Sequence, residues 1–128
     1  MHKKIVIIGA GSIGSRHLQA IKKVNIKIEI YVLDKSDTSL KVAKSRYMEI
    51  KSNNNISKIV FTNKISDLPK SIYLLISATT ASVRYVSTKS ILDLCVVKFI
   101  IFEKFLFLKV KEVNKMRKIL KDKNIKTW

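Results

Sequence analysis

All three glycines of this 128-residue chain lie within six consecutive positions: Gly9, Gly11 and Gly14. They directly follow the apolar run Ile5-Val6-Ile7-Ile8 and form the pattern G-x-G-x-x-G. A short continuous apolar run is typical of a strand that is buried on both faces of a parallel sheet. Glycine reaches backbone conformations that other residues avoid. A chain that uses glycine only here therefore predicts a tight turn between a buried strand and the element that follows it.

The spacing of the glycines predicts what the turn binds. Gly9 would permit the tight turn, Gly11 would let the backbone approach a pyrophosphate, and Gly14 would let the next helix pack closely on the sheet. The N-terminus of that helix offers free N–H donors and the positive end of the helix dipole to phosphates. Ser12 and Ile13, between the last two glycines, are expected to contact the same ligand. The motif thus predicts a dinucleotide-binding loop.

An acidic residue follows at the spacing that such a loop requires. Asp34 stands 20 residues after Gly14, at the end of a second apolar run. Its carboxylate can accept hydrogen bonds from both ribose hydroxyls and would repel a 2′-phosphate, which favours NAD over NADP. Lys35 and Ser36 follow, and either could accommodate a phosphate, so NADP stays an alternative cofactor. A second interpretation makes Asp34 a cap or turn carboxylate.

The rest of the chain alternates between strand and helix patterns. We expect strands at 5–8, 28–33, 59–61, 72–76 and 96–102. We expect helices at 12–23, after a cap at Ser36 or Asp37, at 82–94 and at 109–121, with a polar loop at 51–57 and a turn at 66–69. This order predicts a single α/β domain, residues 1–128, with a doubly wound parallel sheet. Residues 124–128 read as a sixth strand that stops before completion.

The high positive charge of the chain raises the question of whether it binds nucleic acid. The net charge is +17, and basic surfaces attract phosphate backbones. The lysines, however, are scattered over the chain, and only four basic residues are arginine, the side chain whose bidentate fork suits phosphate and base recognition. We therefore expect no specific nucleic-acid partner, and only weak non-specific binding at low salt.

Other composition features narrow the class further. Cys95 is the single cysteine, and no Cys/His cluster accompanies it, so neither an internal disulfide nor a structural zinc site is expected. No apolar run reaches the roughly 18 residues of a membrane helix, and no signal-peptide pattern is present. We expect a cytoplasmic protein that binds neither a metal nor a membrane.

Three segments together resemble the glucose–fructose oxidoreductase, inositol dehydrogenase and rhizopine catabolism family (Gfo/Idh/MocA), whose N-terminal domain is a Rossmann fold. The opening of that family is similar to Gly9-Ala10-Gly11-Ser12-Ile13-Gly14-Ser15-Arg16-His17. The turn after its fourth strand is similar to Ile76-Ser77-Ala78-Thr79-Thr80, although Thr80 stands where proline is common. Its Glu-Lys-Pro motif is similar to Glu103-Lys104-Phe105, with Phe105 in place of proline. The resemblance covers nearly the whole chain.

The resemblance implies an oxidoreductase that acts on a sugar, a polyol or a sugar derivative. Lys104 would be the catalytic residue, because the matching lysine of the family lies near the nicotinamide and the reacting hydroxyl. Its plainer alternative is a surface lysine at a strand end. The remaining positions that the resemblance assigns to the cofactor are Ala78, Thr79, Thr80 and Glu103. Arg84 stands where many members carry a histidine, and we expect it to be a solvated helix residue; His17 is expected simply to pack on its helix.

Length is the main departure from the family. Its members continue into a second α/β domain that supplies the substrate pocket, much of the dimer interface and usually a catalytic histidine. His2 and His17 are not placed to replace that histidine. We therefore expect an inactive cofactor domain, either a truncated gene product or a cloned domain, that needs a missing C-terminal domain or forms a homo-oligomer. The apolar run 105–108 is the candidate for an exposed interface.

A stand-alone NAD-sensing regulatory module is the alternative function. The NAD-binding regulatory domains of potassium transport systems have a similar size and the same glycine pattern. The missing catalytic domain favours this alternative, whereas Glu103 and Lys104 favour the dehydrogenase.

Overall fold

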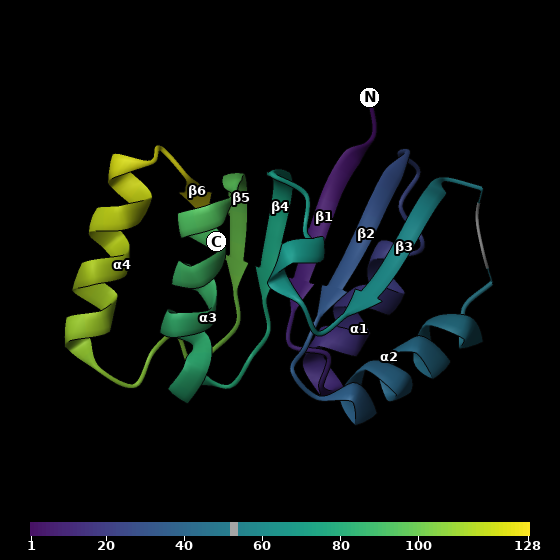
Figure 1. The fold of residues 1–128 in the computed structure, drawn as a ribbon, viewed down its shortest axis with the longest axis horizontal. Coiled ribbons are helices and arrows are strands. Elements are labelled where there is room, and N and C mark those ends of the chain that lie inside the picture. Colours follow the sequence, from purple (N-terminus) through teal and green to yellow (C-terminus); the bar gives the residue numbers. More distant parts are fainter. Residues whose placement is uncertain (52–53) are drawn as a thin grey trace.

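The computed structural model describes residues 1–51 and 54–128. The elements, drawn in Figure 1, are β1 (Lys3–Ile8), α1 (Ser12–Ile21), β2 (Ile28–Leu33), α2 (Asp37–Glu49), β3 (Ile56–Thr62), the 3₁₀ turn η1 (Ile65–Asp67), β4 (Ser71–Ser77), α3 (Ala81–Leu94), β5 (Val96–Phe102), α4 (Val110–Asp122) and β6 (Lys126–Thr127).

Over the described residues, six strands form one parallel sheet in the order β3-β2-β1-β4-β5-β6. The chain winds outward from β1 to β3, then returns to place β4 on the other side of β1. Figure 1 shows α1 and α2 beside the first half of the sheet and α3 and α4 beside the second half. The strand order reverses between β1 and β4, which is where a doubly wound sheet opens a crevice for a ligand. The expected doubly wound α/β fold is confirmed.

Apolar side chains pack on both faces of the sheet because β1 is apolar on both. Val6 and Ile8 join the core under α3 and α4, which includes Ile91 and Met116. Ile5 and Ile7 join the opposite core under α1 and α2, whose helix residues include Leu18, Leu40, Ala43 and Tyr47. All four β1 residues are 5% exposed or less. The central position of β1 follows directly from this uninterrupted apolar run.

The element bounds differ from the expected ones mainly at β3. This strand begins at Ile56, not at residue 59, because its backbone already pairs with Ile28 of β2 there. Ser57 and Lys58 are polar, but they are exposed on an edge strand, where the Ser57 hydroxyl donates to the Ile28 carbonyl, so burial does not exclude them. The expected polar loop at 51–57 is therefore wrong in its last two residues, and its positions 52–53 lie outside the described residues.

The ends of the other helices and strands agree more closely with those expected from the sequence. Ser36 caps α2 by accepting a hydrogen bond from the Ser39 backbone N–H at 3.1 Å. β6 is a short strand that pairs with β5 at Phe99 and Ile100, which confirms an incomplete sixth strand.

The contact between α1 and β1 makes a stability prediction. A Cβ placed on Gly14 would lie 1.7 Å from the carbonyl oxygen of Gly9, which is backbone and cannot rotate away. Gly14→Ala should therefore lower the free energy of unfolding by about 3 kcal/mol or more. A Cβ on Gly11 meets no described atom within 4 Å, so Gly11→Ala should change the free energy of unfolding by less than about 1 kcal/mol. Urea unfolding of the two variants measures both values, and equal losses would contradict the packing argument.

Candidate functional site

The loop between β1 and α1 needs glycine at two of its three positions for reasons internal to the fold. Gly9 has φ +92°, a conformation that other residues rarely adopt, and a Cβ there would lie 2.7 Å from the Thr79 backbone nitrogen. Gly14 has no room for a Cβ, as described above. These two glycines let the loop lie directly against the turn after β4.

Gly11 has no such internal reason to be glycine. Its φ is −71°, which any residue adopts, and a Cβ there would meet open space. Gly11 is the N-cap of α1, and Ser12 and Ile13 beside it are exposed. The backbone N–H groups at the start of a helix have no acceptor within the helix, and the helix dipole favours an anion beside them. An uncovered helix N-terminus without a side chain at Gly11 suits a ligand phosphate that approaches the backbone closely.

Asp34 lies beside this loop, at the end of β2. Its Oδ2 accepts a hydrogen bond from the Ala10 N–H at 2.7 Å, and its Oδ1 accepts one from the Ser36 N–H at 2.8 Å. The carboxylate therefore acts as a turn carboxylate, the second of the two expected roles. The two oxygens together have about four acceptor positions, so two remain for ligand hydroxyls. Lys35, the next residue, is exposed.

The turn after β4 forms the other wall of the loop. Ala78 donates its N–H to the Ile8 carbonyl at 2.8 Å, which joins this turn to the end of β1. Among the described residues, the Thr79 hydroxyl is buried and has no hydrogen-bond partner. Thr80 is the N-cap of α3 and is exposed. Ala78 and Thr79, which the resemblance assigned to the cofactor, thus lie against Gly9, and Thr80 follows them at the start of α3.

Glu103 and His17 form a contact that the sequence analysis did not foresee. His17 Nε2 lies 2.5 Å from Glu103 Oε1, and 27% and 26% of the two side chains are exposed. His17 belongs to the second turn of α1, whereas Glu103 directly follows β5. The pair therefore bridges the helix that begins at the glycine loop and the segment that carries Lys104. The expectation that His17 only packs on its helix was wrong.

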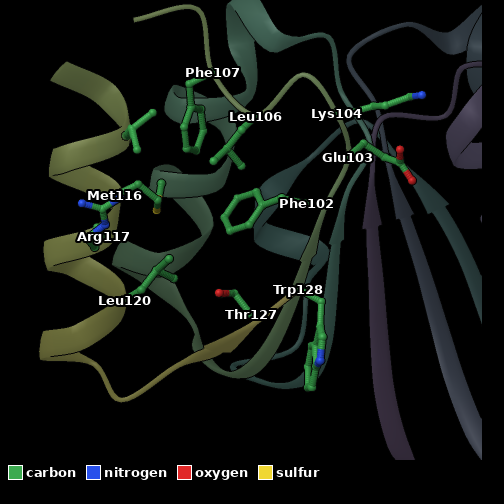
Figure 2. A pocket seen from close by; sticks show the side chains of 11 residues that line it. Phe102, Glu103, Lys104, Leu106, Phe107, Met116, Arg117, Leu120, Thr127 and Trp128 are labelled. Atoms are coloured by element: carbon green, nitrogen blue, oxygen red, sulfur yellow. The ribbon is translucent and has the colours of Figure 1, made fainter. Parts of the chain in front are cut away.

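Lys104 is exposed and follows Glu103 at the end of β5. Figure 2 shows both side chains pointing away from α4, with Phe102, Met116 and Leu120 on the other side of the strand end. The peptide bond between Lys104 and Phe105 is cis. Because Lys104 closely follows the C-terminal end of β5, it lies at the carboxyl edge of the sheet, where the glycine loop also lies.

Arg84 was expected to be solvated, and this expectation is wrong. The residue is 2% exposed. Its Nη1 donates to the backbone carbonyls of Glu103, Phe105 and Leu106, the last at 3.1 Å, and its Nη2 donates to the Thr79 carbonyl. Burial lowers the pKa of Arg84, and the nearby Glu103 carboxylate raises it to a smaller extent. Arginine nevertheless stays protonated at neutral pH.

A hollow of about 440 Å³ lies between α4, β6 and the segment after β5, and Glu103 and Lys104 are among its lining residues. Figure 2 shows it walled by Phe102, Leu106, Phe107, Met116 and Leu120. The expected exposed run 105–108 is partly confirmed. Three of its side chains are exposed, but Phe107 packs edge-on against the rings of Tyr85 and Phe102.

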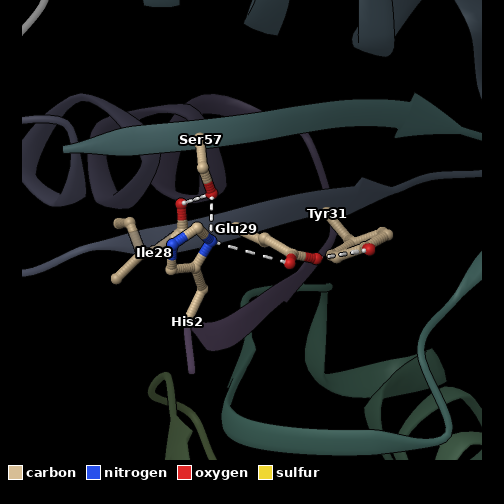
Figure 3. Close-up of polar contacts among 5 residues, drawn as sticks. All are labelled: His2, Ile28, Glu29, Tyr31 and Ser57. Carbon is tan, nitrogen blue, oxygen red and sulfur yellow. Dashed lines mark hydrogen bonds and ion pairs between the residues drawn. The ribbon is translucent and has the colours of Figure 1, made fainter. Parts of the chain in front are cut away.

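His2 lies at the opposite end of the sheet from the glycine loop. Its Nδ1 lies 2.8 Å from the Ser57 hydroxyl and 3.9 Å from Glu29, which also accepts a hydrogen bond from Tyr31 (Figure 3). Burial, and then the hydrogen bond to Glu29, raise the pKa of Tyr31. This cluster joins the amino ends of β1, β2 and β3, so His2 contributes nothing to the candidate site.

Residues 1–51 and 54–128 contain neither a candidate metal site nor a candidate membrane-spanning helix. No group of three or more His, Cys, Asp or Glu side chains could hold a metal ion. No helix in this part of the chain is long and apolar enough to cross a membrane.

No family model and no curated protein matches the sequence. Solved structures do match it. They include myo-inositol 2-dehydrogenase from Lactobacillus plantarum (18% identity, TM-score 0.71, 100% of this chain and 36% of that one). An oxidoreductase from Agrobacterium radiobacter in complex with NAD⁺, L-tartaric acid and magnesium has 16% identity and a TM-score of 0.74, over 99% of this chain and 34% of that one. The WlbA dehydrogenase from Thermus thermophilus, in complex with NAD and UDP-GlcNAcA, has 20% identity and a TM-score of 0.67, over 98% and 40%.

This chain spans only about a third of the length of these proteins. At such low identity, the likeness shows a shared fold. The chain therefore has the Rossmann fold that occurs in these dehydrogenases, and its glycine loop, Asp34 and the turn after β4 meet at one edge of that fold.

Proposed function

We propose that this chain is the NAD(P)-binding domain of an oxidoreductase that acts on a sugar, a polyol or a sugar derivative. The observation that carries the proposal is Gly11. Gly9 and Gly14 are required by the fold, whereas Gly11 leaves open space above a helix N-terminus at the point where the strand order reverses. A ligand phosphate explains that space and the missing side chain.

Different residues of the site would then contact different parts of the cofactor. Asp34 would accept hydrogen bonds from the adenosine ribose, and Gly11, Ser12 and Ile13 would bind the pyrophosphate through backbone N–H groups. The other half of the cofactor would extend over the ends of β4 and β5, toward residues 78–80 and 103–104. When bound, the nicotinamide would supply hydride transfer. Lys104, as a mobile cation, would stabilise negative charge on a substrate oxygen.

The substrate class rests on the matching structures. One of them is an inositol dehydrogenase, and another is a dehydrogenase solved with UDP-GlcNAcA. A second support is the segment Glu103-Lys104, which lies at the same edge of the sheet as the glycine loop. We expect NAD as the cofactor, with NADP as the alternative. A cytoplasmic location follows from the proposal, and the buried free thiol of Cys95 suits such a reducing compartment.

We infer that the domain alone has no appreciable dehydrogenase activity and needs a second domain or another chain. Hydride transfer requires the substrate carbon to be held close to the nicotinamide, and this positioning supplies a large share of the rate. The described hollow under α4 has Glu103 and Lys104 at one side, but most of its lining is apolar side chains, which offer a sugar few hydrogen-bonding groups to hold it in place.

A stand-alone NAD-sensing module remains the second candidate. Such a module would require only the exposed loop at the start of α1, with its open space at Gly11, and no substrate site.

The first prediction of the proposal concerns Gly11. Gly11→Val should abolish binding of both NAD(H) and NADP(H), because its side chain would occupy the proposed phosphate position. The free energy of unfolding should fall by no more than about 1 kcal/mol, because no described atom lies within 4 Å of the new Cβ. Calorimetric titration of the variant and the wild type measures the binding. Equal affinities would refute the loop as the binding site.

The second prediction concerns the choice of cofactor. The wild type should bind NAD(H) more tightly than NADP(H), because the Asp34 carboxylate repels a 2′-phosphate. Asp34→Ser should reduce the affinity for NAD(H) and so narrow the difference between the affinities for NAD(H) and NADP(H). Lys35→Ala serves as the matched control and should keep the preference. A wild-type preference for NADP(H) that Lys35→Ala removes would show that Lys35 sets the specificity instead.

The third prediction concerns turnover. The isolated chain, tested with sugars, polyols and nucleotide-linked sugars, should reduce neither NAD nor NADP above background. Absorbance of the reduced nicotinamide measures the reaction. Robust turnover that disappears in Lys104→Ala would contradict the expected inactivity and identify the chain as a small complete dehydrogenase.

A further inference from the structure

Arg84 is a buried cation whose acceptors are all backbone carbonyls. It is 2% exposed, and its guanidinium donates to Thr79, Glu103, Phe105 and Leu106. Among the described residues, no carboxylate forms an ion pair with it, and its Nε has no hydrogen-bond partner. A buried charge is usually paired with an opposite one, because taking it out of water is costly. The guanidinium charge is therefore compensated only by carbonyl dipoles and, without direct contact, by the nearby Glu103 carboxylate.

The four carbonyls belong to the two segments that the proposed function places around the nicotinamide. Thr79 lies in the turn after β4, and residues 103–106 follow β5. Arg84, which belongs to α3, therefore joins these two segments through its hydrogen bonds to their carbonyls. In a trans peptide the N–H points opposite to the carbonyl. With the carbonyls of Thr79 and Glu103 turned toward Arg84, the positive ends of these peptide dipoles point away from the guanidinium.

Three other titratable groups lie near Arg84 and must be counted. Lys104 adds a second positive charge, but it is exposed and screened by water. Glu103 supplies a negative charge, and its carboxylate faces His17 of α1 at 2.5 Å. With His17 neutral, the charges of Arg84, Lys104 and Glu103 sum to +1, and protonation of His17 makes the sum more positive. The region is electropositive in either state.

We propose that this buried charge makes the site select the reduced cofactor over the oxidised one. The nicotinamide ring of the oxidised cofactor carries a positive charge, whereas the ring of the reduced cofactor is neutral. A fixed cation in a poorly solvated region repels the first and not the second. The inference rests on the proposed function, since it requires the nicotinamide to lie beside residues 79 and 103–106. It identifies Arg84 as a positioning residue whose charge also sets the redox preference.

Wild-type protein tests the inference with three ligands. ADP-ribose, which lacks the nicotinamide, reports on the adenosine and phosphate part alone. Calorimetry should show that NADH binds about tenfold more tightly than NAD⁺. NAD⁺ should bind no more tightly than ADP-ribose, because repulsion offsets the contacts of its ring. If ADP-ribose does not bind, the proposed function itself is refuted. If ADP-ribose binds and NAD⁺ matches NADH, only the redox preference is refuted.

Substitutions at Arg84 separate charge from geometry. Arg84→Lys keeps the charge but cannot donate to four carbonyls at once, so all affinities should fall while the NADH preference stays within about twofold of wild type. Arg84→Gln removes the charge, and the preference should fall to about threefold or less. Arg117→Gln, which removes an exposed arginine from α4, is the matched control and should behave as wild type.

The outcomes at Arg84 are distinct. Loss of the preference in the glutamine variant but not in the lysine variant supports the charge mechanism. Equal loss in both variants overturns it and assigns the effect to loop geometry. Circular dichroism of each variant establishes that it is folded, and if neither variant folds, the wild-type comparison of NADH with NAD⁺ still decides the proposal.

Discussion

The approach of α1 to the end of β1, with Gly14 against the Gly9 carbonyl, determines the geometry of the whole binding edge. A Cβ on Gly14 would push the helix away from the end of β1, and a Cβ on Gly9 would clash with the backbone of the turn after β4. With both absent, α1 begins immediately beside the turn after β4, and Ala78 bonds to the Ile8 carbonyl. The two central parallel strands thus end at the same level. A ligand can then contact a helix N-terminus and both strand ends at once.

Segments far apart in the sequence complete this edge. Asp34 approaches the loop from β2 and bonds to Ala10, while His17 reaches from α1 to Glu103. Arg84 holds the segment after β5 from α3. The position of Lys104 therefore depends on two helices that follow the two central strands. The His17–Glu103 contact thus links α1, at whose N-terminus the phosphates are proposed to bind, to the segment that carries Lys104.

Sequence reasoning located the glycine loop, Asp34 and the parallel sheet because each depends on local spacing. Glycine positions, apolar runs and a distance of 20 residues are readable without contacts. It failed for Arg84 and for the His17–Glu103 pair because most of their partners lie 19 to 86 residues away, and Arg84 binds carbonyls, which every residue has. The start of β3 was missed because edge pairing with β2 extends a strand into polar residues. One signal did exist for Arg84, since it stands where the resembling family carries a histidine.

The central place of β1 has a consequence for how the chain is made. Its apolar residues are synthesised well before its neighbour β4, which begins 63 residues after β1 ends. At about 5–20 residues per second, β1 waits several seconds for that partner. During this time only β2 can cover one of its edges, and its backbone and apolar side chains stay accessible to other nascent chains. Parallel strands of high sequence separation also fold slowly. Among neighbouring strands of the described sheet, β1 and β4 are the furthest apart in sequence, so β1 is the strand that waits longest for a partner.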